Sequence, residues 1–94
     1  MTRVLVVEDD PAIGRLLQRS LTGRGDVVTR APDGASGLSL VLQDRPEVVI
    51  LDLGLPDLDG RQVLRMLRAV SQVPVIVVTA QDDDRAVVQA LDDG

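Results

Sequence analysis

Apolar and polar positions along the chain follow two alternating patterns. Short aliphatic runs, typical of buried strands, occur at residues 3–7, 47–52 and 73–78, and a weaker run occurs at 26–31. Between and after these runs, apolar residues recur at the three- and four-residue spacing that places them on one side of a helix. The pattern therefore predicts strands and helices in strict alternation, with each strand followed by a helix.

Residues that favour helix ends mark where the expected helices begin and end. The Asp10–Pro11 pair suits an N-cap and a first helical position, and the Asp33–Gly34 pair opens a second helix in a similar way. A third helix is expected over residues 61–70, and a fourth after the acidic run 82–84, with Gly94 at its end. The inward-facing stripes of these helices comprise Ile13, Leu16, Leu17 and Leu21, then Leu38, Val41 and Leu42, then Val63, Leu64 and Leu67, and finally Ala86, Val87, Ala90 and Leu91.

Strict alternation of strands and helices implies right-handed crossovers and a parallel sheet with helices on both of its faces. We therefore interpret residues 1–94 as one doubly wound α/β domain. A domain of this class normally ends with a further strand and helix, and none follows the fourth expected helix. The domain is therefore expected to be incomplete at its C-terminus, with an open sheet edge at residues 73–78 that invites pairing with another chain.

Composition excludes several classes of chemistry. The chain has no Cys and no His, which removes thiol chemistry, zinc–thiolate sites and the commonest general base, and it has no aromatic residue for base stacking. The net charge of −5 argues against direct binding of nucleic acid. No apolar run is long enough to span a membrane and no signal-peptide pattern is present, so a soluble cytoplasmic protein is expected.

Acidic residues directly follow two of the aliphatic strands. Asp52 closes the run at 47–52, and Glu8 and Asp9 follow the run at 3–7. The carboxyl ends of neighbouring parallel strands meet at one edge of a sheet, where open α/β sheets bind their ligands. Like charges held close together repel one another, and a hard divalent cation with oxygen ligands relieves that repulsion. The sequence therefore predicts a carboxylate-lined metal site with Asp52 at its centre.

Four stretches of the chain carry specific motifs in a fixed order: residues 6–11 (VVEDDP), 50–53 (ILDL), 55–60 (LPDLDG) and 75–80 (VIVVTA). Taken together, they resemble the receiver domain of two-component response regulators, in particular the receivers that precede a winged-helix DNA-binding domain. The resemblance covers the whole chain. It implies a flavodoxin-like sheet with strand order 2-1-3-4, from which the fifth strand and last helix of the family are absent.

The resemblance also implies a function and a role for individual residues. The protein would accept a phosphoryl group from a sensor histidine kinase with Mg²⁺ as cofactor, without being an enzyme, and would act on DNA only through an output domain outside this chain. The family pattern makes Asp52 the phospho-acceptor, Glu8, Asp9 and Asp52 the Mg²⁺ ligands, Gly54 a further ligand through its backbone carbonyl, Thr79 the switch hydroxyl and Ala80 the small residue beside the site.

One departure from the family pattern opens an alternative. The family has a Lys at the end of a fifth strand, which pairs with the phosphoryl group, and this chain contains no Lys. Truncation before the fifth strand explains the absence. The alternative hypothesis is a fragment that is not phosphorylated and acts as a dimerisation or strand-exchange module, through its open sheet edge or its fourth helix.

Two other interpretations fit the sequence less well. A phosphatase of the haloacid-dehalogenase type also uses a strand-end Asp as nucleophile, but it would carry a second Asp where this chain has Gly54. A dinucleotide-binding domain would carry a Gly-rich turn after the first strand, where this chain has acidic residues and Pro11.

Overall fold

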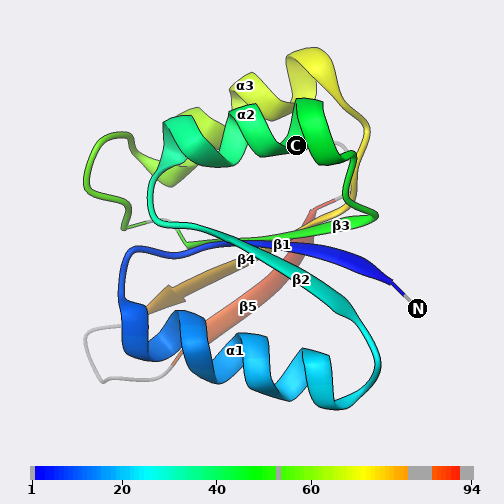
Figure 1. Ribbon diagram of the computed structural model, residues 1–94. Helices are drawn as coiled ribbons and strands as arrows, with labels where there is room; N and C mark the ends of the chain where they lie inside the picture. The colour runs from blue at the N-terminus through cyan, green and yellow to red at the C-terminus, as the bar shows by residue number, and fades with distance from the viewer. Residues whose placement is uncertain (1, 53, 81–85, 92–94) are drawn as a thin grey trace.

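The computed structural model describes residues 2–52, 54–80 and 86–91, which form one sheet and three helices (Figure 1). The elements are β1 (Arg3–Val7), α1 (Pro11–Gly23), β2 (Val27–Ala31), α2 (Gly34–Asp44), β3 (Val48–Asp52), α3 (Gly60–Val70), β4 (Val75–Ala80) and β5 (Ala86–Leu91). The strands are hydrogen-bonded in the order β2-β1-β3-β4-β5, and β1 to β4 run parallel, so the expected order 2-1-3-4 is confirmed. No helix in this described part is long and apolar enough to cross a membrane.

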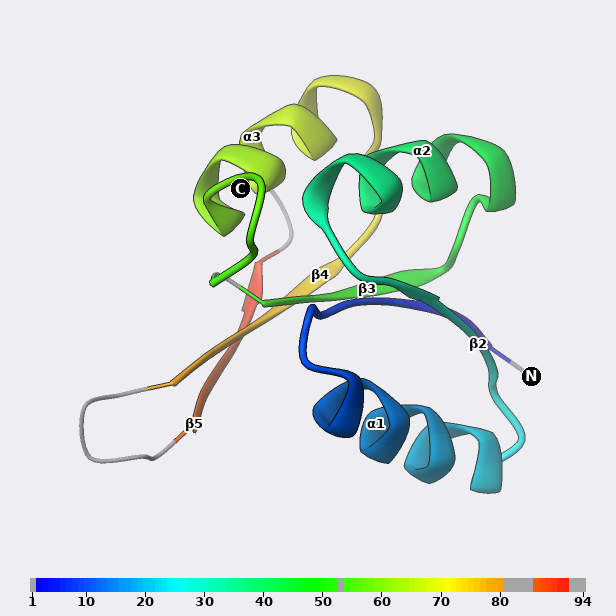
Figure 2. The same cartoon turned by 60° about the vertical axis from the view of Figure 1, so that its left-hand side comes forward.

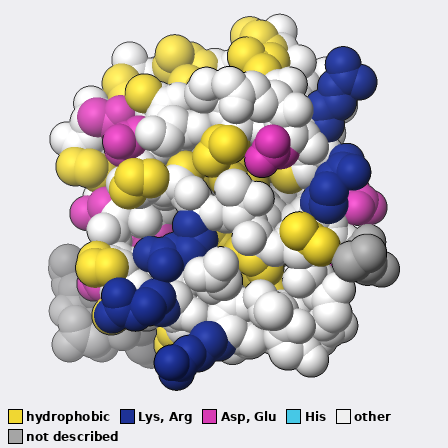
Figure 3. Space-filling view, viewed as in Figure 1, with side chains coloured by type: hydrophobic (Ala, Val, Ile, Leu, Met, Phe, Trp, Pro, Cys, Tyr) yellow, Lys and Arg dark blue, Asp and Glu magenta, His cyan; other side chains and the backbone are white. Residues whose placement is uncertain are grey.

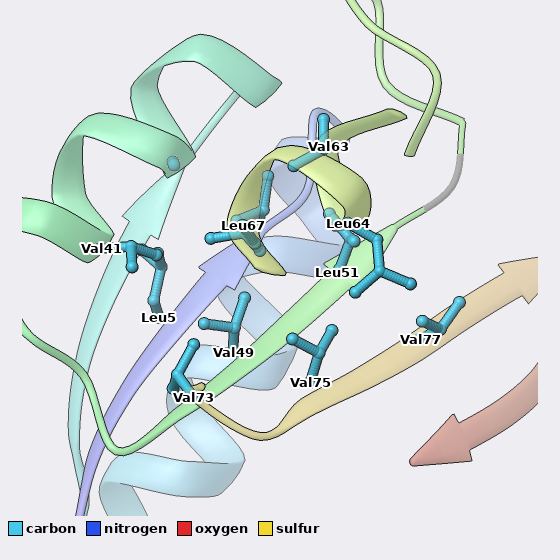
Figure 4. Close-up of a cluster of buried hydrophobic side chains, with 12 residues drawn as sticks. Leu5, Val41, Val49, Leu51, Val63, Leu64, Leu67, Val73, Val75 and Val77 are labelled. Atoms are coloured by element: carbon cyan, nitrogen blue, oxygen red, sulfur yellow. The ribbon is translucent and has the colours of Figure 1, made fainter. Parts of the chain in front are cut away.

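The sheet lies between two helical layers of unequal size. Helices α2 and α3 cover one face, and α1 lies on the other face against β1 and β2 (Figures 1 and 2). The main core fills the space between the sheet and the α2–α3 layer (Figure 4). Leu5 and Leu51 contribute to it from the sheet, and Val63 and Leu67 from α3, and all four are fully buried. The inward stripe expected for the third helix is therefore confirmed.

The stripes expected for the first two helices are only partly buried. Ile13 and Leu16 on α1 are 45% and 64% exposed, and Leu42 on α2 is 59% exposed. Hydrophobic side chains are visible at the surface over the α2–α3 layer (Figure 3). On the opposite face, no helix among the described residues lies against β4 and β5 (Figure 2). Consistent with this, β3 alternates between buried and half-buried positions. The expectation that this strand is buried on both faces is therefore not met.

An aspartate caps the N-terminus of each helix described. Its side chain accepts a hydrogen bond from a backbone N–H of the first turn, a donor that has no partner within the helix. The caps expected at Asp10 and Asp33 are confirmed, and Pro11 takes the first position of α1. The bonds are Ala12 N to Asp10 Oδ1 (2.9 Å), Ser36 N to Asp33 Oδ1 (2.8 Å) and Arg61 N to Asp59 Oδ1 (2.8 Å).

The segment 86–91 differs most from expectation. It forms β5, an antiparallel partner of β4 in which Val88 lies opposite Val78, so the prediction of a fourth helix is wrong. The sheet therefore has a fifth strand in addition to the four that the hydrophobic pattern predicts. Residues 82–84 and Gly94, expected at the ends of that helix, lie outside the described residues.

Two physical properties account for the strand. A short apolar run cannot be assigned to helix or strand by periodicity alone, and the β-branched pair Val87–Val88 favours a strand. Pairing also provides partners for the N–H and C=O groups along the outer side of β4. The sheet edge expected to be open at residues 73–78 is therefore paired within the chain over most of its length.

Candidate metal centre

The carboxyl ends of β1 and β3 meet at one edge of the sheet. Val7 lies opposite Leu51 in the parallel register, so the residues that follow them, Glu8 and Asp52, come to the same level. Glu8, Asp9 and Asp52 each place one carboxylate oxygen within 4.8 Å of the other two. The structure thus brings together the three acidic side chains that the sequence placed in one crevice.

Glu8 is the most buried of the three, with 9% of its surface exposed. Its N–H donates to the Ala31 carbonyl on β2 (3.0 Å), and its Oε1 accepts from the Asp10 N–H (3.1 Å). Burial raises the pKa of Glu8 to about 7; the charges of Asp52 and Asp9 add to this rise, and the hydrogen bond from Asp10 opposes it. Near neutral pH this carboxyl group is therefore easily protonated.

Asp52 is half-buried at the last position of β3. Its Oδ1 accepts a hydrogen bond from the Gly54 N–H (3.1 Å), so its side chain forms a local turn directly after the strand. The turn places Gly54 beside Asp52. Apart from its two chain neighbours, a Cβ added at Gly54 would find Asp52 Oδ1 as its nearest neighbour, at 3.9 Å.

Thr79 and Ala80 are the last two residues of β4. Asp52 lies opposite Val78 in the register, so the backbone of Thr79 follows directly at the same edge of the sheet. The side chains of Thr79 and Ala80 lie outside the described part of the structure. Their expected roles therefore stay predictions.

Asp57 makes a contact that sequence reasoning missed. Its Oδ1 accepts from the Gly34 N–H (2.8 Å) and its Oδ2 from the Ala35 N–H (3.1 Å), so it binds the N-terminus of α2 from the loop between β3 and α3. The hydrogen bond from Gly34 is the main cause that lowers the pKa of Asp57. No local signal identifies this contact, because Asp33 already provides the expected N-cap of α2.

The donor set at the crevice fits a small divalent cation. The three side chains offer only carboxylate oxygens, which are the ligands that Mg²⁺ and Ca²⁺ prefer. Mg²⁺ keeps several of its waters and needs only one or two carboxylates from a protein, which a site at the exposed edge of a sheet permits. Three carboxyl groups within 4.8 Å of one another also repel, and a divalent cation removes that repulsion.

Residues 4–94 match the family model described as the response regulator receiver domain. The chain belongs to this family. Among its relatives are the transcriptional regulatory proteins KdpE of Mycobacterium tuberculosis, 50% identical over 94 residues, and AfsQ1 of Streptomyces coelicolor, 43% identical over 94 residues. Each match covers 100% of the chain and 42% of the relative, so the receiver chain spans less than half the length of these curated proteins.

Solved receiver structures have the same fold. The BeF3-activated N-terminal receiver domain of Klebsiella pneumoniae RstA superimposes with a TM-score of 0.81 at 33% identity, over 87% of this chain and 70% of that one. TrrA of Thermotoga maritima, in complex with Mg²⁺ and BeF, gives a TM-score of 0.81 at 31% identity, over 90% and 75% of the two chains. The flavodoxin-like receiver fold is therefore confirmed.

Proposed function

We propose that this receiver domain accepts a phosphoryl group on Asp52 from a sensor histidine kinase, in a reaction that depends on Mg²⁺. The observation that carries the proposal is the cluster of Asp52 with Glu8 and Asp9, whose oxygens lie within 4.8 Å at the carboxyl edge of the sheet. Family membership supports it, because receiver domains of response regulators are phosphorylated by histidine kinases.

The protein must supply a nucleophile and must position it against the phosphoryl group. A carboxylate oxygen of Asp52 attacks the phosphorus of a phosphohistidine; an O–P bond forms, the P–N bond breaks, and the imidazole leaves with the electron pair. An ionised carboxylate is already a nucleophile, so no general base is needed, which suits a chain without His and Cys. When bound, Mg²⁺ would neutralise negative charge on the phosphoryl oxygens.

The residues around Asp52 take complementary roles in this proposal. Glu8 and Asp9 hold the cation with Asp52, and Gly54, fixed beside Asp52 by its N–H, offers its carbonyl. The Thr79 hydroxyl donates to a phosphoryl oxygen, and Ala80 leaves room for the group. New negative charge beside Thr79 then biases the backbone that follows β4 between two arrangements, which is a local electrostatic switch.

We further propose that the chain is the input part of a transcriptional regulator. The two relatives named as transcriptional regulatory proteins are more than twice as long as this chain, since it covers 42% of each. A net charge of −5 does not suit direct DNA binding, so a winged-helix output domain elsewhere in the protein would bind DNA. In this role the chain is a cytoplasmic phosphoryl acceptor and not an enzyme.

Labelling with radioactive acetyl phosphate, with and without Mg²⁺, tests the proposed chemistry. We expect label on the wild-type chain only when Mg²⁺ is present, and no label on Asp52→Asn. Asp44→Asn, at the last residue of α2, is the control that should keep the label. A wild-type chain that takes no label with Mg²⁺ present, or an Asp52→Asn variant that takes as much label as the wild type, would contradict the proposal.

A second candidate function is self-association through the sheet edge. Strand β5 forms that edge. Charged residues and proline usually protect edge strands from pairing with another chain, and residues 86–91 contain neither. Two copies would then pair through their β5 strands. Light scattering would show a dimer that does not change with Mg²⁺, whereas a monomer at every concentration would rule this candidate out.

A further inference from the structure

We propose that Asp57 is a positioning residue for the metal site: by binding the N-terminus of α2, it fastens the loop between β3 and α3 and keeps Gly54 in place beside Asp52. This inference rests on the proposed function, because it concerns the cation that the Asp52 cluster would hold. Asp57 itself does not belong to that cluster.

The contact between Asp57 and α2 uses both carboxylate oxygens. The Gly34 N–H donates to one oxygen at 2.8 Å and the Ala35 N–H to the other at 3.1 Å. The separate cap Asp33 accepts from the Ser36 N–H at 2.8 Å. The two aspartates thus divide the free donors of one helix terminus, and only Asp57 belongs to the loop that leads back to Asp52.

The helix terminus that Asp57 binds is itself closely packed. A Cβ added at Gly34 would lie 2.8 Å from Cγ2 of Val63 and 3.0 Å from Cδ1 of Leu58. A Cβ added at Gly37 would lie 2.9 Å from Cγ2 of Val7. The first turn of α2 therefore packs directly on α3 and β1. Such a close approach leaves it little freedom to move, so it is a firm anchor for the loop.

Three hydrogen-bonded contacts hold the loop after β3, in which Leu55 and Leu58 also pack against the core. At its start, the Gly54 N–H binds Asp52; at its middle, Asp57 binds α2; and at its end, Asp59 caps α3 by accepting from Arg61 N at 2.8 Å. Gly54 is an exposed glycine with wide backbone freedom. Its carbonyl direction therefore depends on how the loop is held on either side of it. On the C-terminal side, Asp57 is the nearest hydrogen-bonded attachment, beyond the packing of Leu55 on the core.

The charge of Asp57 strengthens this attachment. Hydrogen bonds to an ionised carboxylate are stronger than those between neutral groups. The Gly34 and Ala35 N–H groups lower the pKa of Asp57, so it stays ionised across the neutral range. An Asn at this position keeps one acceptor oxygen and loses the second bond as well as the charge, so it should preserve part of the anchor.

Isothermal titration calorimetry with MgCl₂ tests the inference, since the chain has no aromatic residue to report binding by fluorescence. We expect Asp57→Ala to weaken Mg²⁺ binding about threefold to tenfold, less than the about 10–100-fold typical when a direct partner of a metal ligand is removed. Asp57→Asn should fall between Asp57→Ala and the wild type. Asp33→Ala, the matched control, removes a cap from the same helix and should keep wild-type affinity.

Amide hydrogen exchange gives a readout that does not depend on the cation. In Asp57→Ala without Mg²⁺, the Gly54 amide should exchange faster, whereas in Asp33→Ala it should not. Wild-type Mg²⁺ affinity in Asp57→Ala, or equal losses in Asp57→Ala and Asp33→Ala, would overturn the positioning role and leave the proposed function intact. A wild-type chain that binds no Mg²⁺ would overturn both.

Discussion

Glu8 is buried beside Asp52, and ionisation of Glu8 therefore destabilises the folded state. Burial, with the charges of Asp52 and Asp9 in addition, raises the pKa of Glu8 from 4.5 to about 7. A group with a raised pKa binds its proton more tightly in the folded protein than in the unfolded one. Its stabilising contribution is fully present below pH 4.5 and is lost as the pH rises through about 7.

The first prediction concerns this pH dependence. Without divalent cations, the free energy of unfolding from urea denaturation, followed by circular dichroism, should contain a component that falls between about pH 5 and about pH 8. Glu8→Gln, which cannot ionise, should lack that component, so the difference between the two proteins isolates Glu8. Parallel pH profiles for the wild type and the variant would show that Glu8 ionises freely in the folded protein.

The second prediction concerns Mg²⁺ as a stabilising ligand. A ligand that binds only the folded state adds about 2.7 kcal/mol to the free energy of unfolding at a concentration about 100 times its dissociation constant. Wild-type protein at neutral pH should show this gain when MgCl₂ is added at constant ionic strength. Asp9→Asn should lose most of the gain, because Asp9 supplies one of the clustered oxygens. An equal gain in the variant would mean that Mg²⁺ acts elsewhere.

The third prediction compares two buried glycines. A Cβ on Gly37 would lie 2.9 Å from Cγ2 of Val7, a fully buried residue of β1, so Gly37→Ala should lower stability by about 1–3 kcal/mol. At Gly14 the nearest atom is Nη2 of Arg30 at 2.8 Å, the end of a flexible side chain that can move aside.

Gly14→Ala is therefore the control for Gly37→Ala. It should cost much less, because alanine is favoured over glycine in a helix by about 1 kcal/mol, which offsets the movement of Arg30. Urea denaturation of both variants decides the comparison. If Gly14→Ala were the more damaging change, the Arg30 guanidinium would be held more firmly than its contacts indicate.

The fourth prediction concerns two leucines that have similar positions in the hydrophobic pattern. Leu67 on α3 is 1% exposed, and Leu67→Ala should cost about 2–5 kcal/mol through lost burial and the cavity left behind. Leu16 on α1 is largely exposed, and Leu16→Ala should change stability by less than about 0.5 kcal/mol. Similar losses in the two variants, measured by thermal or urea denaturation, would mean that the outer side of α1 is covered in solution.

Much of the candidate site could be predicted from short stretches of the sequence. Glu8, Asp9 and Asp52 each follow an aliphatic run, and parallel strands bring their carboxyl ends to one edge, so their proximity follows from the order of the elements alone. The raised pKa of Glu8 could not be predicted from the sequence in this way. It depends mainly on burial, which the packing of the surrounding chain decides.

The sequence by itself determined the four parallel strands, the aspartate caps and the order of the acidic residues, because each depends on a few residues within one element or motif. Only the tertiary structure decided that Asp57 binds α2, that Leu16 and Leu42 stay exposed, and that residues 86–91 pair with β4 as a strand. Each of these outcomes depends on which surface or backbone edge lies opposite a residue in space. Hydrophobic spacing shows which side of an element is apolar, but it does not show what that side meets.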